Sequence, residues 1–205
     1  MRPSFKVLIA IVLTLAAAGA LGAAWVSLVE APAPKVATSG TAAIGGPFTL
    51  VSTNDGNVTD QTYRGKWLLI FFGYTFCPDL CPTTLSEIAG ALAQLGPLAA
   101  HVQPVFVSID PHRDTPKALR EYVENFDARI LPLSGNVEQL ARAAASVGVV
   151  FYKVPGPTPD EYTFAHNAVV TLVGPEGGIV TRFSSDVVVD DLARALRRLI
   201  DPAGS

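Results

Sequence analysis

The apolar residues of the chain gather in short continuous runs and in longer segments with helical spacing. Trp67 to Phe72 is one such run, and its aromatic and branched side chains predict a strand that is buried on both faces. In Pro82 to Leu95 the apolar residues lie three or four positions apart, as on one face of a helix. Similar patterns predict further strands at Val102–Ile109, Arg129–Leu133, Val149–Tyr152, Ala168–Val173 and Ile179–Phe183, and further helices from Asp114 or Thr115 to about Phe126, from Asn136 to Val147 and from Val189 to Ile200.

Strands that alternate with helices predict an α/β domain whose sheet is rich in parallel strands. The last two strands flank a turn, Gly174 to Gly178, so we expect them to form an antiparallel hairpin at one edge. A second hairpin is expected before Trp67, where Phe48–Val51 and Val58–Thr59 flank the turn Asn54–Asn57. Residues 47–205 are therefore predicted to form one α/β domain that begins with a β-hairpin.

The N-terminal segment differs from the short apolar runs of the domain, because residues 7–29 form one long stretch without a charged residue. Such a length can span a bilayer, which needs about 20 apolar residues. Arg2 and Lys6 precede it, so we expect residues 1–6 in the cytoplasm and a single-pass anchor at residues 7–29. Residues 30–46, rich in Pro, Ala and Gly, would be a flexible linker to a domain on the periplasmic side of the inner membrane.

A secretory signal peptide is the alternative interpretation of the same segment. Its basic start, its apolar centre and the small residues Ala18 to Ala20 fit a cleaved leader. Under both interpretations the globular domain is exported.

Composition and charge exclude one class of partner. The chain is 49% hydrophobic and 16% charged, against about 25% charged in typical domains, and the apolar N-terminal segment contributes to the excess of hydrophobic residues. The formal net charge is −3, and no block of Lys and Arg occurs. Because nucleic acid binding needs clustered positive charge to neutralise phosphates, we expect no nucleic acid partner.

The two cysteines of the chain, Cys77 and Cys81, lie between the strand that ends at Phe72 and the helix that follows. Ligands of open α/β sheets bind at this end of the strands, and a helix N-terminus favours the thiolate form. Two thiols at this spacing can hold a soft metal ion or close a disulfide. A structural disulfide is common in exported proteins, but such a small loop would add little stability.

The three histidines help to choose between these chemistries. His101 lies in a polar turn, and His112 has charged neighbours that favour a surface position, whereas His166 directly precedes the apolar strand at Ala168. His166 is thus the best candidate for a third ligand. Two thiolates and one imidazole suit copper(I), whereas structural zinc needs four donors. Asp79 and Asp110 are candidates to orient ligands by hydrogen bonds, or they are cap and turn residues.

Several short motifs give the domain a resemblance to a known family. The motifs are Gly73–Thr75, Cys77–Pro82, Val107–Pro111, Arg113–Pro116 and His166. In these motifs the chain resembles the Sco/SenC family, the copper chaperones of cytochrome c oxidase assembly. The resemblance implies a thioredoxin-like fold with a central mixed sheet flanked by helices. It also implies that Cys77, Cys81 and His166 bind copper(I) or copper(II), and that one N-terminal helix anchors the protein.

The implied partner is the dinuclear copper site of cytochrome c oxidase subunit II, which would receive copper, have its cysteines reduced, or both. Other copper chaperones or thiol reductants are further implied partners. The chain departs from the family pattern at Phe76, where a histidine is common, and at Ala165, where an aspartate commonly precedes the histidine.

The alternative function is that of a thioredoxin-like or peroxiredoxin-like thiol oxidoreductase without a metal. It would use Cys77 and Cys81 as a redox pair in the same fold. Thioredoxins, however, have two residues between their cysteines and a proline facing the pair, and no proline occurs between Asp160 and Gly174. A peroxiredoxin would have Thr or Ser where Tyr74 stands.

Overall fold

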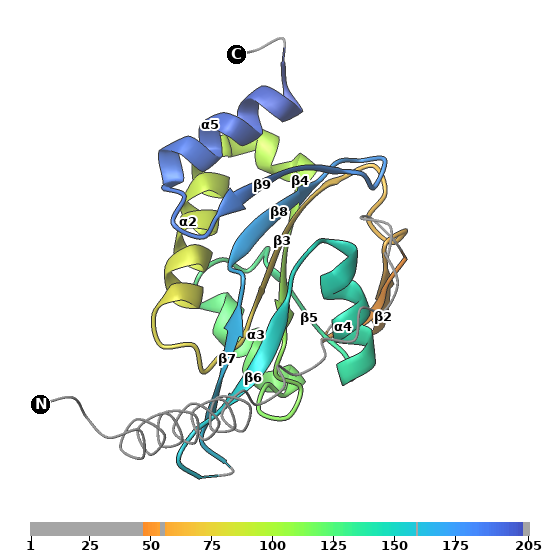
Figure 1. Ribbon diagram of the computed structural model, residues 1–205. Coiled ribbons are helices and arrows are strands. Elements are labelled where there is room, and N and C mark those ends of the chain that lie inside the picture. The colour runs from red at the N-terminus through yellow and green to blue at the C-terminus, as the bar shows by residue number, and fades with distance from the viewer. Residues whose placement is uncertain (1–46, 54–55, 159, 203–205) are drawn as a thin grey trace, which may run out of the picture. The chain divides into compact units, whose positions relative to one another are not determined.

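A seven-stranded mixed sheet lies at the centre of the domain (Figure 1). The computed structural model of the protein describes residues 47–53, 56–158 and 160–202. In spatial order the strands of the sheet are β2 (Gly56–Thr59), β1 (Thr49–Ser52), β5 (Leu131–Ser134), β4 (Val102–Ser108), β3 (Trp67–Gly73), β8 (Val169–Val173) and β9 (Ile179–Ser184). The helices are α2 (Leu80–Leu95), the short 3₁₀ helix η1 (Gly96–His101), α3 (Pro116–Glu124), α4 (Val137–Ser146) and α5 (Val189–Ile200).

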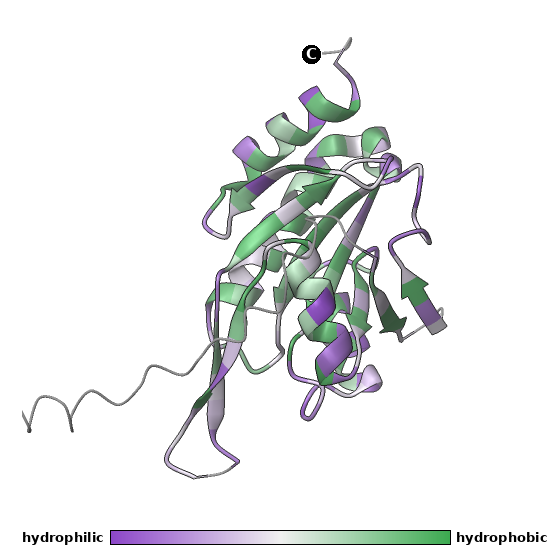
Figure 2. Ribbon diagram, turned by 45° about the vertical axis from the view of Figure 1, so that its right-hand side comes forward, coloured by the Kyte–Doolittle hydropathy of each residue, from purple (hydrophilic) through white to green (hydrophobic). Residues whose placement is uncertain are grey.

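Strand β3 is buried on both faces, as its continuous apolar run predicts. Because side chains alternate along a strand, Leu69 and Phe71 point into one core, with residues of α2, α3 and α5. Leu68, Ile70 and Phe72 point into a second core, with residues of α4 and of the β1–β2 hairpin. Figure 2 shows these central strands mostly in green, the colour of hydrophobic residues, whereas α4 and α5 carry both green and purple segments.

The predicted order of elements is confirmed, including the N-terminal hairpin and the antiparallel pair β8–β9. The parallel part of the sheet is limited to β3, β4 and β5, so the sheet is mixed. Helix α2 begins at Leu80, before the predicted Pro82. As a result Cys81 lies in the first helical turn and Cys77 lies ahead of the helix.

One strand was not expected from the sequence. Strand β7 (Tyr162–His166) pairs with β6 (Phe151–Pro155) in a separate two-stranded sheet, which we call the β6–β7 hairpin. The sequence pattern predicts no strand between Tyr152 and Ala168. The hairpin extends away from the main sheet in Figure 1, and it places His166 at the end of a strand rather than in a loop.

The predicted anchor (7–29), its cytoplasmic start (1–6) and the linker (30–46) lie outside the described residues. Within the ranges that the structure describes, none of the helices has the length and apolarity needed to cross a bilayer.

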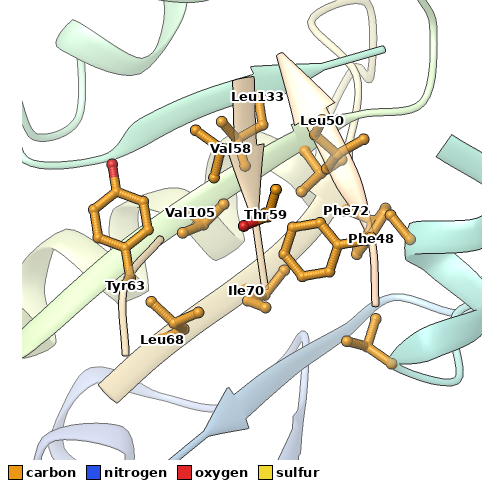
Figure 3. A pocket seen from close by; sticks show the side chains of 13 residues that line it. Phe48, Leu50, Val58, Thr59, Tyr63, Leu68, Ile70, Phe72, Val105 and Leu133 are labelled. Atoms are coloured by element: carbon orange, nitrogen blue, oxygen red, sulfur yellow. The ribbon is translucent and has the colours of Figure 1, made fainter. Parts of the chain in front are cut away.

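A small apolar cavity lies between the β1–β2 hairpin and the central strands β3 and β4 (Figure 3). Its walls include Phe48, Leu50, Ile70 and Phe72. It holds a volume of about 20 Å³, which is room for about one water molecule, whereas small-molecule sites have roughly 300–1,000 Å³. This cavity is therefore a packing defect of the hydrophobic core and is too small to be a ligand-binding site.

Candidate metal centre

Residues 74–79, which we call the thiol loop, connect β3 to α2 and carry Cys77. The backbone N–H of Cys81, in the first turn of α2, donates a hydrogen bond to Cys77 Sγ at 3.4 Å. Cys81 is buried and Cys77 is half-buried, and both are free thiols. The strand–helix junction therefore brings the two cysteines together, as predicted from the sequence.

Gly73, the last residue of β3, makes room for the inner sulfur. A Cβ atom at this position would lie 2.8 Å from Cys81 Sγ and 2.9 Å from Cε2 of Phe106. Both distances are shorter than real contacts of a Cβ atom. Only glycine therefore fits here without displacing the sulfur or the aromatic ring.

The pKa values of the two thiols are shifted in opposite directions. Hydrogen bonding from Cys81, supported by the backbone N–H groups of Asp79 and Leu80, lowers the pKa of Cys77 to about 6. For Cys81, the interaction with Cys77 and its own burial raise the pKa. A negative charge on the pair is thus stabilised mainly on Cys77, the more exposed sulfur, which is the arrangement of an attacking thiolate with a buried second thiol.

The buried carboxylate of Asp114 holds the thiol loop in place by hydrogen bonds. Asp114 accepts hydrogen bonds from the backbone N–H of Thr75 at 3.1 Å and from the Thr75 hydroxyl at 2.6 Å. It also accepts one from the Ser108 hydroxyl, at the end of β4, at 2.6 Å. Of the two predicted starting residues of helix α3, Thr115 is the N-cap and accepts a hydrogen bond from the backbone N–H of Ala118. The loop is tied to the sheet.

The β6–β7 hairpin contacts the thiol loop through a second group of residues. The backbone N–H of Phe164 donates to the Tyr74 hydroxyl at 3.4 Å. Arg113 donates to the carbonyl of Tyr162 at 3.0 Å, and its guanidinium lies over the rings of Tyr162 and Phe76, 3.7 and 4.6 Å from their centroids. Arg113 thus bridges the residue before Cys77 and the strand that ends in His166.

Asp110 completes this group of residues. It is fully buried, pairs with Arg113 and accepts a hydrogen bond from the Tyr162 hydroxyl at 2.8 Å. Its carboxylate therefore orients the hairpin rather than a cysteine. Asp79, the other candidate, stands at the N-cap position of α2, but in the described structure its side chain makes no capping hydrogen bond.

His166 lies at the same edge of the sheet as the cysteines. Phe71 in β3 is the register partner of Val170 in antiparallel β8, so the end of β3 lies beside the start of β8. The centroids of the His166 and Phe71 rings are 6.4 Å apart. The next residue, Asn167, fixes the base of the hairpin, because its side chain accepts from the N–H of Val150 at 2.7 Å and donates to the carbonyl of Gly148 at 3.1 Å.

The imidazole of His166 carries an unused buried nitrogen. Among the described residues, nothing forms a hydrogen bond with its Nδ1 atom. Burial lowers the pKa of His166, which favours the neutral form that binds metals. However, within residues 47–53, 56–158 and 160–202 no three His, Cys, Asp or Glu side chains lie close enough together to hold a metal ion. The structure forms the thiol pair and leaves the histidine apart from it.

The other two histidines are exposed, as expected: His101 ends η1, and His112 lies in the turn after β4. The sequence did not reveal Asp114, Arg113 or Tyr162 as parts of the site. For Tyr162 a signal existed, because Tyr162, Phe164 and His166 alternate as in a strand.

A mixed α/β sheet with two free thiols where a central strand meets a helix defines a thioredoxin-like protein. The family model described as SCO1/SenC matches residues 36–201. Protein SCO1 homolog 2, mitochondrial, of Arabidopsis thaliana is 40% identical over 157 residues, which cover 75% of this chain and 55% of that protein. The chain belongs to the SCO1/SenC family.

Solved structures agree with this assignment. The structure of Bradyrhizobium japonicum ScoI with copper bound is 42% identical, with a TM-score of 0.70, and the match covers 76% of this chain and 99% of that one. Yeast Sco1 with copper bound is 29% identical, also with a TM-score of 0.70, and the match covers 79% of this chain and 92% of that one. The chain spans about half the length of several curated relatives, such as the human SCO1 homolog, of which it covers 54%.

Proposed function

We propose that this protein is a copper metallochaperone in which Cys77, Cys81 and His166 hold the metal. The observation that carries the proposal is the pairing of a preformed thiol pair with a buried, unused imidazole nitrogen at the same sheet edge. Two relatives were solved with copper bound. Copper, as copper(I) or copper(II), is the cargo, and its destination is the dinuclear copper site of cytochrome c oxidase subunit II.

The donor set agrees with this cargo. Thiolates are soft ligands and imidazole is a nitrogen ligand that suits copper, whereas magnesium and calcium prefer oxygen ligands. Cys77 already carries much of its charge at neutral pH because its pKa is lowered to about 6, so copper binding needs to displace little more than one proton, from Cys81. The hairpin that carries His166 would have to move toward the sulfurs to complete the site.

The same pair can reduce a disulfide of the partner. The Cys77 thiolate attacks one partner sulfur, the partner S–S bond breaks, and the other partner sulfur leaves as a thiolate. Deprotonated Cys81 then attacks Cys77 Sγ, and the second partner thiolate leaves. The partner gains two electrons, and Cys77 and Cys81 become a disulfide. The oxidised pair no longer offers thiolates, so oxidation also releases copper to the partner.

We further propose that residues 7–29 anchor the protein in the inner membrane as a single span, with the domain on the periplasmic side. The uncharged length of this segment and the preceding Arg2 and Lys6 support it. Protease added to spheroplasts should degrade the domain and leave a membrane-bound N-terminal fragment. A domain released in soluble form by a signal peptidase would instead support the cleaved leader.

Anaerobic copper titration of the reduced protein tests the proposed ligands. Wild type should bind one copper per chain, and His166→Ala should bind it about tenfold or more weakly, because one of three donors is lost. His112→Ala is the matched control, because that histidine is exposed. Equal affinity of His166→Ala and wild type would exclude His166 as a ligand.

A thiol oxidoreductase without a metal is the second candidate function, and the lowered pKa of Cys77 favours it. The same titration separates the two. A wild-type protein that takes up no stoichiometric copper but reduces disulfides rapidly would establish the oxidoreductase and reject the chaperone.

A further inference from the structure

We propose that residues 42–46, which directly precede the described domain, dock as a strand along the outer edge of β6, with Ile44 in an apolar groove between β6 and α4. The inference concerns an interaction surface of the fold and goes beyond the proposed function.

The groove has a volume of about 250 Å³ and lies between β6, the first turn of α4 and the turn after β4. Helix α4 and strand β6 lie side by side in Figure 1. Two of the lining side chains, Val137 of α4 and Tyr152 of β6, are 61% and 64% exposed. Large apolar side chains that remain this exposed on both walls of a groove indicate a surface that another segment covers.

The groove runs along the edge of β6 rather than over one of its faces. Phe151 and Tyr152 are neighbours in the strand, so their side chains point to opposite faces. Both line the groove. Only a groove beside the strand edge can be lined by both, so a chain lying in it would meet the backbone of β6.

This edge of β6 carries unpaired backbone groups. The N–H of Gly156 donates to the carbonyl of Glu161 at 2.6 Å, which makes these two residues a hydrogen-bonded pair. Because hydrogen-bonded and non-hydrogen-bonded pairs alternate in an antiparallel ladder, Phe151 and Lys153 direct their N–H and C=O groups away from β7. Among the described strands, β6 pairs with β7 alone. A free edge of this kind is a template for an added strand.

The position of residues 42–46 in the chain fits this groove. The described domain begins at Pro47, and Phe48 lines a small cavity together with Val147 at the C-terminal end of α4. Leu140, which lines the groove, stands seven residues before Val147, about 10 Å along the helix. Ile44 stands four residues before Phe48, about 13 Å in an extended chain. A chain that runs back from Phe48 along α4 therefore brings Ile44 to the groove.

The composition of the segment fits an apolar groove beside a backbone edge. Residues 42–46 read Ala-Ala-Ile-Gly-Gly and carry no charge, and Ile44 is their one large side chain. Gly45 and Gly46 allow a close approach to α4, because they have no Cβ atom. The family match begins at residue 36, so the segment belongs to the part of the chain that the family shares.

Hydrogen exchange of backbone amides, followed by NMR in the full chain in detergent and without metal, tests the docked strand. In wild type the amides of Phe151 and Lys153 should exchange slowly, because the segment accepts their hydrogen bonds. Ile44→Asp places a charge in the apolar groove and should release the segment, so both amides should exchange about tenfold faster or more. Ala33→Asp is the matched control, because it adds the same charge outside the segment. Continued protection of Phe106, in β4, shows that each variant keeps its fold.

Val137→Asp tests the other side of the contact. This side chain is exposed in the first turn of α4, where an acidic residue is favourable, so the variant should fold. We expect the same faster exchange at Phe151 and Lys153. Rapid exchange of these amides in wild type, or slow exchange that persists in Ile44→Asp, would overturn the inference. Protection that disappears on dilution would also overturn it, because it would assign the groove to a second copy of the chain. The measurement needs no copper, so its outcome is independent of the proposed function.

Discussion

The thiol loop and the β6–β7 hairpin lie side by side but are built into the protein differently. Hydrogen bonds to the buried Asp114 hold the thiol loop. Among the strands of the described residues, β6 and β7 pair only with each other, and most residues of β6 are exposed. Its contacts with the loop depend on Tyr74 and Arg113.

This difference suggests that the thiol loop and the β6–β7 hairpin have separate roles. The hydrogen bonds to Asp114 hold the thiol loop in place, which positions the two sulfurs for thiol chemistry. Under the proposed function, His166 on the less firmly held hairpin would approach the sulfurs when copper binds. Thiol reactivity should therefore be independent of the hairpin, whereas copper affinity should depend on both regions.

The largest effect is expected from Cys81→Ser. A hydroxyl is a poor ligand for a soft metal, so copper affinity should fall by about 100-fold or more. Titration with a competing copper(I) chelator measures it. Alkylation of Cys77 should continue in this variant. Copper affinity within a few-fold of wild type would remove Cys81 from the site.

The pH dependence of Cys77 tests the thiol loop alone. With a pKa of about 6, Cys77 gains its thiolate as pH rises through 6 and should be about 90% thiolate at pH 7, against roughly 3% for an ordinary cysteine. The rate of alkylation by iodoacetamide should therefore level off near pH 7. A rate that still rises from pH 7 to pH 9 would contradict the assigned pKa.

Gly73→Ala tests the space around Cys81. The added methyl group would collide with Cys81 Sγ and the Phe106 ring, which should lower the free energy of unfolding by about 1–3 kcal/mol. Gly178→Ala is the control, because a Cβ atom there meets nothing within 4 Å. Urea denaturation of the reduced proteins measures both, and equal stability of the two variants would contradict the close packing.

Arg113→Lys should have the smallest effect and separates the two regions. Lysine keeps the charge beside Asp110 but loses the planar group that stacks on Phe76 and Tyr162. Copper affinity should fall about fivefold, with the Cys77 alkylation rate unchanged. Arg142→Lys, at an exposed pair with Glu138, is the control. An equal fall of both properties would show that the hairpin and the thiol loop act as one unit.

Much of the fold followed from the sequence, because long apolar runs and helical spacing are local signals. The thiol pair was predicted for the same reason, since Cys77 and Cys81 follow directly on the run of β3. Contacts between distant residues were not readable. Thr75 and Asp114 are 39 positions apart, and Arg113 and Tyr162 are 49 apart, so their pairing depends on the packed fold. Strand β7 was not predicted, although Tyr162, Phe164 and His166 alternate with more polar or smaller residues as in a strand.

X-ray absorption at the copper edge tests the central claim most directly, because it counts the donors that the thiol loop and the hairpin contribute together. Wild type loaded with one copper(I) should show two sulfur ligands and one imidazole nitrogen, and His166→Ala should lose the imidazole signal while both sulfurs remain. A wild-type spectrum without an imidazole, or an imidazole signal that persists in His166→Ala, would contradict the account.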